Sequence, residues 1–191
     1  MKMIKKDDVF CICDFETTGI TDEDYPIEIG CIFTDNYFRV LETYTSYISV
    51  PIQDKAWPEK YQNAYNVHKI PLSTIYCKGK NTQSISKDIN NIRKKYGQRM
   101  TIVSDNPYFE MLHMKKVFKG YSSINKRTIP FESIFHHVPW GVNMLLAPMN
   151  VQYATHNSHR ALADASNMHC AIVRAMEKIN YYENYKRNTN G

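Results

Sequence analysis

The alternation of hydrophobic and polar positions predicts that the chain begins with three strands. Val9 to Cys13 is a short apolar run typical of a buried strand, and Ile27 to Phe33 predicts a second strand. A turn signal at Asp35 and Asn36 follows, and the β-branched and aromatic run from Tyr37 to Val50 predicts a third strand. We expect these three strands to form an antiparallel meander.

The rest of the chain alternates between helical and strand-like patterns. Apolar residues at helical spacing in Thr82 to Tyr96 predict an amphipathic helix. The other expected segments are short helices and loops over 51–79, a short strand over 101–103, a helix from Pro107 to about Phe118, a short helix over 131–138, a loop over 139–153 and a long helix over 160–178. This order predicts an α/β fold with a mixed sheet.

Length and composition favour one domain. The chain has 191 residues, so we expect a single domain over 1–180 and a polar, flexible tail over 181–191. The five cysteines form no CxxC pair and no regular disulfide spacing. Neither a signal-peptide pattern nor an apolar stretch of ~20 residues is present, which predicts a cytoplasmic protein without a membrane span. The net charge of +5 suits a polyanionic partner.

A pair of carboxylates follows the first strand directly. Because alternate residues of a strand face the same side, Asp14 and Glu16 are expected to point the same way. Like charges repel, and a divalent cation is the common way to offset that repulsion. Thr17, Thr18 and Gly19 then turn the chain, with Gly19 permitting a positive φ. Backbone N–H groups at such a turn can hold a phosphate or a terminal hydroxyl.

A second group of polar residues lies near the other end of the chain. Asp164 stands in an apolar, alanine-rich stretch of the predicted closing helix, and His159 lies at its entrance. Buried carboxylates need partners, so Asp164 is a candidate for a binding site rather than for a solvated surface.

These segments together resemble the DnaQ-like, DEDDh family of 3′→5′ exonucleases. Asp14 to Gly19 (DFETTG) is similar to the first motif of that family, and His159 to Ala165 (HRALADA) is similar to the third. Ser104 to Glu110 (SDNPYFE) resembles the second motif. The motifs occur in the family's order, and the resemblance spans about residues 9–176.

The second motif departs from the family pattern. The family has Asn, a short spacer, an aromatic residue and then the catalytic Asp. Matching Asn106 and Phe109 to that pattern places Glu110 at the Asp position. Asp105 offers another carboxylate on the other side of Pro107, although it can instead cap the following helix. We favour Glu110 and keep Asp105 as the alternative.

The resemblance implies a ribonuclease H-like fold, with a mixed five-stranded sheet flanked by helices, and two Mg²⁺ or Mn²⁺ ions. Asp14 would bridge both ions, while Glu16 and Asp164 would complete one site. Either Glu110 or Asp105 would contribute through water. His159 would act as general base, with a rate that rises through about pH 6–8. Substrate contacts are expected from Asn106 and from the main chain at Thr17 and Thr18, which would recognise the free 3′-OH.

The expected partner is single-stranded DNA or RNA, or short oligonucleotides, and the sequence does not choose between them. The chain carries no polymerase domain of its own, so a proofreading role would require a polymerase or replication partner. A homodimer is a further possibility, formed through the 51–80 and 120–150 segments. The alternative function is a nucleic-acid-binding or interaction module on the same fold, with a metal site weakened by Glu110.

Overall fold

A five-stranded mixed sheet organises the computed structural model, which describes residues 8–51, 57–96, 99–120, 129–147 and 158–189. The strand order is β3-β2-β1-β4-β5. The first three strands are antiparallel, whereas β1, β4 and β5 run parallel. The strands are β1 (Val9–Thr17), β2 (Pro26–Thr34), β3 (Val40–Tyr47), β4 (Met100–Ser104) and β5 (Trp140–Gly141). The predicted antiparallel meander and mixed sheet are therefore confirmed.

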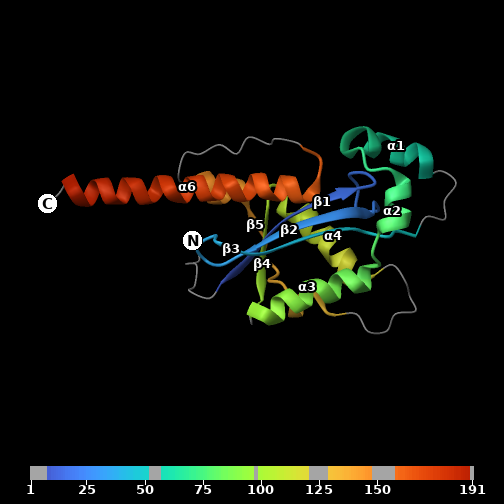
Figure 1. Ribbon diagram of the computed structural model, residues 1–191, viewed down its shortest axis with the longest axis horizontal. Coiled ribbons are helices and arrows are strands. Elements are labelled where there is room, and N and C mark those ends of the chain that lie inside the picture. The colour runs from blue at the N-terminus through green and yellow to red at the C-terminus, as the bar shows by residue number, and fades with distance from the viewer. Residues whose placement is uncertain (1–7, 52–56, 97–98, 121–128, 148–157, 190–191) are drawn as a thin grey trace.

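Helices cover both faces of the sheet (Figure 1). On one face, Cys11, Cys13 and Phe15 of β1 pack against α3 (Thr82–Tyr96) and α4 (Pro107–Lys119). On the other face, Phe10 and Ile12 pack against α5 (Val142–Leu146) and α6 (Ala161–Thr189). This alternation places Phe15 in the core and directs Asp14 and Glu16 to the α6 side, as the strand pattern predicted.

Two further helices lie beyond one end of the sheet. Helix α1 (Trp57–His68) and helix α2 (Leu72–Lys78) contribute Tyr61 and Ile75 to a separate small core, which also buries Ile27 of β2. In the segment over 51–79, expected to hold short helices and loops, α1 and α2 thus form the wall of the molecule beside the β1–β2 turn (Figure 1), while residues 52–56 lie outside the described residues.

The prediction for residues 131–153 was wrong in two places. Instead of a helix over 131–138, the chain forms a single 3-10 turn at Phe131–Ser133 and then runs beside β4, where His136 N–H donates to the Met100 carbonyl at 2.9 Å. Strand β5 and helix α5 occupy part of the expected loop. The backbone groups on the edge of β4 that faces away from β1 need hydrogen-bond partners. The chain around Phe135 and strand β5 pair with that edge. Residues 148–153 lie outside the described residues.

The closing helix is longer than predicted. It continues to Thr189, so residues 181–189, for which we expected a polar tail, are helical and project past the sheet (Figure 1). Its buried stripe consists of Ala161, Ala165, Met168, Ile172 and Ala175, which recur at helical spacing. No helix in the described part of the chain combines the length and the apolar character that crossing a membrane requires.

The close approach of α6 to the sheet depends on a glycine in β2. A Cβ built on Gly30 would lie 2.2 Å from the backbone nitrogen of Leu162 and 2.3 Å from the carbonyl carbon of Ala161. Gly30 pairs with Asp14 across the β1–β2 ladder. The missing side chain therefore lets the first turn of α6 reach the sheet beside Asp14.

We expect Gly30→Ala to destabilise the protein, because the new methyl group meets backbone that cannot move aside without shifting α6. The loss in the free energy of unfolding should be roughly 1–3 kcal/mol or more, measured by urea denaturation. Gly141→Ala is the matched control, since its Cβ would find its nearest neighbour at 3.7 Å. Equal stability of the two variants would contradict the close-packing argument.

Candidate active site

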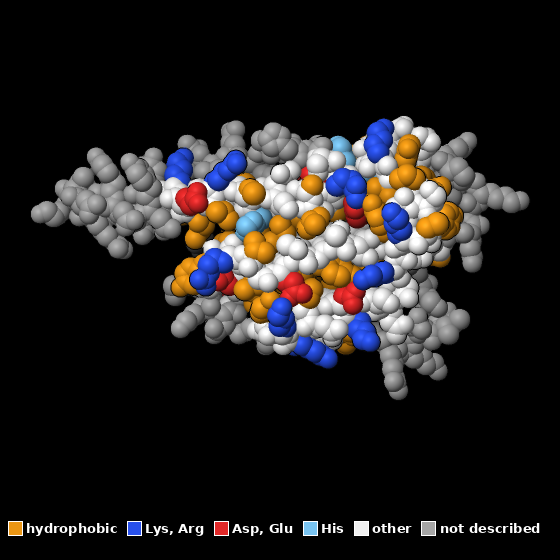
Figure 2. All heavy atoms as spheres, viewed as in Figure 1, with side chains coloured by type: hydrophobic (Ala, Val, Ile, Leu, Met, Phe, Trp, Pro, Cys, Tyr) orange, Lys and Arg blue, Asp and Glu red, His pale blue; other side chains and the backbone are white. Residues whose placement is uncertain are grey.

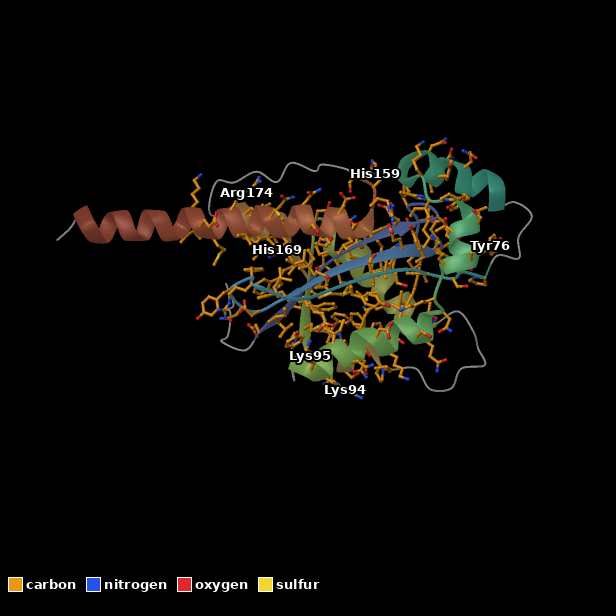
Figure 3. The ribbon with its side chains drawn as sticks, in the orientation of Figure 1. Tyr76, Lys94, Lys95, His159, His169 and Arg174 are labelled. Carbon is orange, nitrogen blue, oxygen red and sulfur yellow. The ribbon has the colours of Figure 1, made fainter. Side chains whose placement is uncertain are left out.

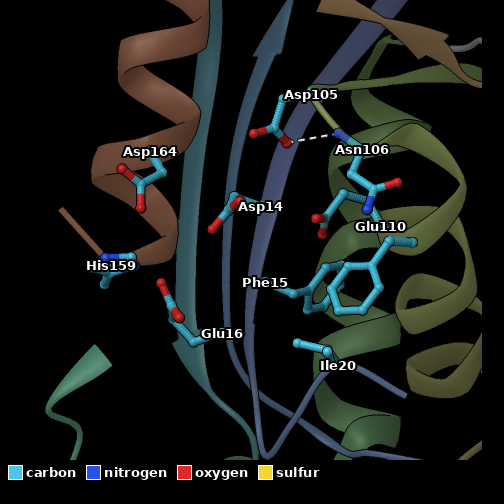
Figure 4. A pocket seen from close by; sticks show the side chains of 10 residues that line it. Asp14, Phe15, Glu16, Ile20, Asp105, Asn106, Glu110, His159 and Asp164 are labelled. Carbon is cyan, nitrogen blue, oxygen red and sulfur yellow. Dashed lines mark hydrogen bonds between the residues drawn. The ribbon is translucent and has the colours of Figure 1, made fainter. Parts of the chain in front are cut away.

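Five carboxylates converge at the ends of β1 and β4, and Asp14 is common to two groups of them. Ligand oxygens of Asp14, Glu16 and Asp164 lie within 4.8 Å of one another, and the same holds for Asp14, Asp105 and Glu110. Figure 4 shows Asp14 between Asp164 of α6 on one side and Asp105 and Glu110 on the other. Three segments far apart in the sequence thus place negative charge around one residue of β1.

These residues line an open pocket of about 340 Å³. His159, Asn106, Phe15, Ile20 and Phe109 complete its walls. Because β1 and β4 are parallel neighbours, their carboxyl ends meet at the same edge of the sheet, which brings Asp14 close to Asp105. All the predicted catalytic and metal-binding residues therefore line one pocket (Figure 4).

Burial and mutual repulsion disfavour the charged forms of the central carboxylates. Burial, followed by the charges of Glu16 and Asp164, raises the pKa of Asp14 well above its usual value. The pKa of Glu16 rises to about 8, first through burial and then through Asp164 and Glu28. Burial and the charge of Asp14 also raise the pKa of Glu110. A bound cation would reverse this balance, because it favours the ionised forms.

The two candidates for the second-motif carboxylate differ in their surroundings. Glu110 is 3% exposed, and its Oε2 atom has no hydrogen-bond partner among the described residues. Asp105 is exposed, and its Oδ1 accepts from the backbone N–H of Asn106 at 2.7 Å. A buried oxygen without a partner is costly unless something satisfies it. Carboxylate oxygens suit Mg²⁺ and Mn²⁺, so the donor set fits a divalent cation, and Glu110 fits it better than Asp105.

His159 and Asp164 are held at the entrance of α6. His159 adopts a left-handed backbone conformation with φ of 50°, which is uncommon for a residue other than glycine. The Oδ1 atom of Asp164 accepts hydrogen bonds from the Ser158 backbone N–H at 3.1 Å and from its hydroxyl at 2.9 Å. These contacts fix the chain just before the helix and keep His159 on the rim of the pocket.

A buried carboxylate that we did not predict as a site residue anchors this entrance. Glu28 of β2 accepts from Arg160 Nη2 at 2.7 Å and from Arg160 Nε at 3.2 Å. It also accepts from the backbone N–H of Ala161 at 3.1 Å, and Arg160 in turn contacts the Tyr47 hydroxyl. The sequence did carry a signal, since Glu28 is an isolated acid within an apolar strand, as Asp164 is within an apolar helix.

Hydrogen bonds among its own residues stabilise the turn after β1. Asp24, which is 1% exposed, accepts from the Thr18 hydroxyl and from both the N–H and hydroxyl of Thr21. The Thr18 N–H, a predicted substrate contact, donates instead to the Tyr25 carbonyl at 2.9 Å. Gly19 does not adopt the positive φ that a glycine permits. A Cβ at this position would lie 2.5 Å from the Asp24 carboxylate, which favours glycine there.

Comparison with solved structures identifies proteins of the same architecture. The chain is similar to E. coli exonuclease I in complex with a dT13 oligonucleotide (TM-score 0.64, 16% identity, 93% of this chain and 43% of that chain). It is also similar to the zinc-bound form of the same enzyme with single-stranded DNA (TM-score 0.62, 17% identity, 91% of this chain and 42% of that chain).

The chain shares its fold with exonuclease I. This agreement confirms the predicted ribonuclease H-like arrangement of a mixed sheet between helices. The chain spans less than half the length of these structures. No protein-family model matches the sequence, and no curated protein matches it.

The basic residues do not form one continuous patch on the face drawn in Figure 2, where Lys and Arg side chains are interspersed with Asp and Glu. Lys94 and Lys95 lie on α3, across the molecule from His159 (Figure 3), and Lys95 pairs with Glu42 at 2.9 Å. Lys116 of α4 donates to the backbone carbonyls of Asp22 and Asp24 and so braces the β1–β2 turn. The basic residues within 2–6 and 126–127 lie outside the described residues.

The raised pKa of Glu16 predicts how stability depends on pH in the metal-free protein. In the unfolded chain this carboxyl titrates near 4.5, whereas in the fold its pKa is about 8. Between these values the folded protein holds a proton that the unfolded chain has released, so raising the pH favours unfolding. We expect the free energy of unfolding in EDTA to fall from about pH 5 to about pH 8, and Glu16→Gln to reduce that fall by on the order of 1.4 kcal/mol for each pKa unit.

Urea denaturation at several pH values measures this effect. Exposed Glu177→Gln makes the same chemical change on α6 outside the pocket and should leave the pH dependence of the wild type intact. Parallel curves for Glu16→Gln and the wild type would rule out the raised pKa.

Proposed function

We propose that this protein is a divalent-metal-dependent 3′→5′ exonuclease of the DEDDh type, acting on single-stranded nucleic acid. The observation that carries the proposal is the position of Asp14, which belongs to both carboxylate groups of a pocket that also holds His159. Sites that clamp the reacting oxygens of a phosphodiester use two cations ~3.5–4 Å apart, and a shared carboxylate is suited to bridge such a pair.

Two sets of residues would hold the cations. One ion would be held by Asp14, Glu16 and Asp164, and the other by Asp14 with Glu110 or Asp105. The unpartnered Oε2 of Glu110 supports its role as a ligand. Bound there, Mg²⁺ or Mn²⁺ would supply Lewis acidity that stabilises charge on the phosphoryl and leaving oxygens.

His159 would accept the proton of the attacking water. An imidazole is an efficient general base near neutral pH, and such a base contributes about 10²–10⁴-fold to the rate. Its place on the rim of the carboxylate pocket supports this role. The contacts of Ser158 with Asp164, and of Glu28 with Arg160, restrain the backbone on both sides of the histidine.

The choice of polymer is proposed from the structural neighbours. Exonuclease I has been solved with single-stranded DNA and with a dT13 oligonucleotide, so single-stranded DNA is the first substrate to test, with RNA beside it. The cytoplasmic location, the homodimer and the polymerase partner stay predictions. A binding module with a weakened site is the second candidate function, since Glu110 replaces the family's Asp; it would bind strands without cleaving them in Mg²⁺ or Mn²⁺.

We expect stepwise shortening of single-stranded DNA or RNA from the 3′ end in Mn²⁺, followed with separate 5′ and 3′ labels, and none in EDTA. Asp14→Asn should lower the rate by at least about 100-fold, because it weakens a ligand common to both cations. Exposed Glu177→Gln is the control and should keep the rate of the wild type. Shortening that persists in EDTA would refute the metal-dependent mechanism.

His159→Ala should lower the turnover number by about 10²–10⁴-fold with little change in KM, because the histidine acts on the attacking water rather than on binding. His137→Ala is a suitable control, since His137 is exposed and lies outside the pocket. Turnover at the wild-type level in His159→Ala would show that another group accepts the proton.

A further inference from the structure

A groove of about 370 Å³ runs along the outer side of α4, next to the carboxylate pocket. One wall is Asp22 of the β1–β2 turn, and the rest is formed by residues of α4, which are Tyr108, Phe109, Met111, Leu112 and Lys115. Phe109 also lines the carboxylate pocket, so the groove and the pocket adjoin at this residue. A chain molecule that lies across the carboxylates could therefore continue along α4.

The groove follows an apolar stripe on the side of α4 that faces away from the core. Tyr108, Leu112 and Lys115 stand at positions i, i+4 and i+7, which lie on one side of a helix. The buried residues of the same helix, which include Met114 and Val117, pack into the core beneath the sheet. Tyr108 is 69% exposed, so core packing does not account for an aromatic residue at this position.

The groove changes from aromatic to basic along the helix. At ~1.5 Å per residue, Lys115 lies about 10 Å farther along the axis of α4 than Tyr108. The Lys115 Nζ atom lies 5.4 Å from the centroid of the Phe131 ring, a contact that restricts where the ammonium group can lie. Asp22 on the facing wall disfavours an anion there. The groove therefore offers a ring near the carboxylate pocket and a cation beyond it.

We propose that the α4 groove binds the single strand on the 5′ side of the scissile phosphodiester, with a base stacked on Tyr108 and a neighbouring phosphate beside Lys115. Aromatic rings combined with basic side chains bind single strands with little dependence on sequence. Removal of nucleotides from the 3′ end leaves the remaining strand on the 5′ side, so an extended surface serves that side. The proposal rests on the proposed function only in placing the scissile phosphodiester at the carboxylates.

Strand length tests this inference without cleavage. A dinucleotide and an octanucleotide of thymidylate, each with a 5′ fluorescent label, are titrated with the full chain in EDTA and followed by anisotropy. The wild type should bind the octanucleotide about tenfold or more tightly, because only the longer strand reaches Tyr108 and Lys115. Equal affinity for the two strands overturns the proposal.

Variants of Tyr108 test the stacking contact. Tyr108→Ala should weaken binding of the octanucleotide by about 5–100-fold, the range expected for loss of one stacked base, and leave binding of the dinucleotide unchanged. Tyr108→Phe keeps the ring and should keep the affinity of the wild type. Tyr76→Ala is the matched control, because it removes a tyrosine of similar exposure, 60%, from α2.

The salt dependence of binding tests the phosphate contact. Lys115→Gln should weaken binding of the octanucleotide and reduce the slope of log affinity against log salt concentration by about 0.7, the change expected for one phosphate of a single strand. Tyr108→Ala should leave that slope unchanged. Lys94→Gln is the control, because Lys94 is exposed on α3 (Figure 3), and it should keep both the affinity and the slope.

The outcomes distinguish this inference from the proposed function. Wild-type affinity for the octanucleotide in both Tyr108→Ala and Lys115→Gln overturns the proposal, whether or not the protein cleaves strands, and points to a protein partner for the groove. Loss of affinity in both variants, in a protein that cleaves no polymer in Mn²⁺, supports the groove and contradicts the exonuclease. Melting temperatures equal to that of the wild type show that the variants are folded.

Discussion

The ion pair between Glu28 and Arg160 is the contact on which the geometry of the site depends. Glu28 is buried near the start of β2, and it accepts from the half-exposed Arg160 guanidinium and from the first backbone N–H of α6. Loss of the guanidinium would leave a buried carboxylate without its cation, which is destabilising. The start of α6 is therefore tied to one point on β2, and that point sets where His159 and Asp164 lie.

The ion pair between Glu28 and Arg160 also reduces the repulsion between neighbouring carboxylates of the site. Glu28 sits opposite Glu16 in the β1–β2 ladder, so its charge raises the pKa of Glu16, while Arg160 lowers it. The guanidinium thus offsets part of the repulsion that Glu28 adds. Asp14 and Glu110 have no such cation beside them among the described residues, and their pKa values are raised. The fold holds the cluster in place at a cost in stability, as expected where function requires it.

Local patterns were sufficient to predict much of the fold. The amphipathic spacing correctly predicted the bounds of α3, Thr82–Tyr96. Strand alternation predicted that Asp14 and Glu16 lie on one face of the sheet. Residues 131–147 were mispredicted because their structure depends on pairing with the edge of β4, which lies about 35 residues earlier in the chain and which no local pattern reveals.

The residues of the candidate site that belong to short sequence motifs could be predicted. The residues whose importance depends on packing between distant segments could not. Asp105 and Glu110 lie close together in the sequence, and no sequence pattern predicted which of the two side chains is buried. The structure distinguishes them by exposure. Gly30 carries no local signal, because its importance is defined by the approach of α6 to the sheet.

Two adjoining cavities lie beside the β1–β2 turn and differ in chemistry. One is lined by carboxylates and suits divalent cations, whereas the other is largely apolar. The wall between them is the β1–β2 turn, which Asp24 braces from within and Lys116 braces from α4. Because contacts within the protein hold that wall in place, a ligand that binds beside it would cost little in loop ordering. Under the proposed function, such a wall would help to hold a bound phosphodiester in one position relative to Asp14 and His159, and positioning of this kind lowers the barrier to hydrolysis.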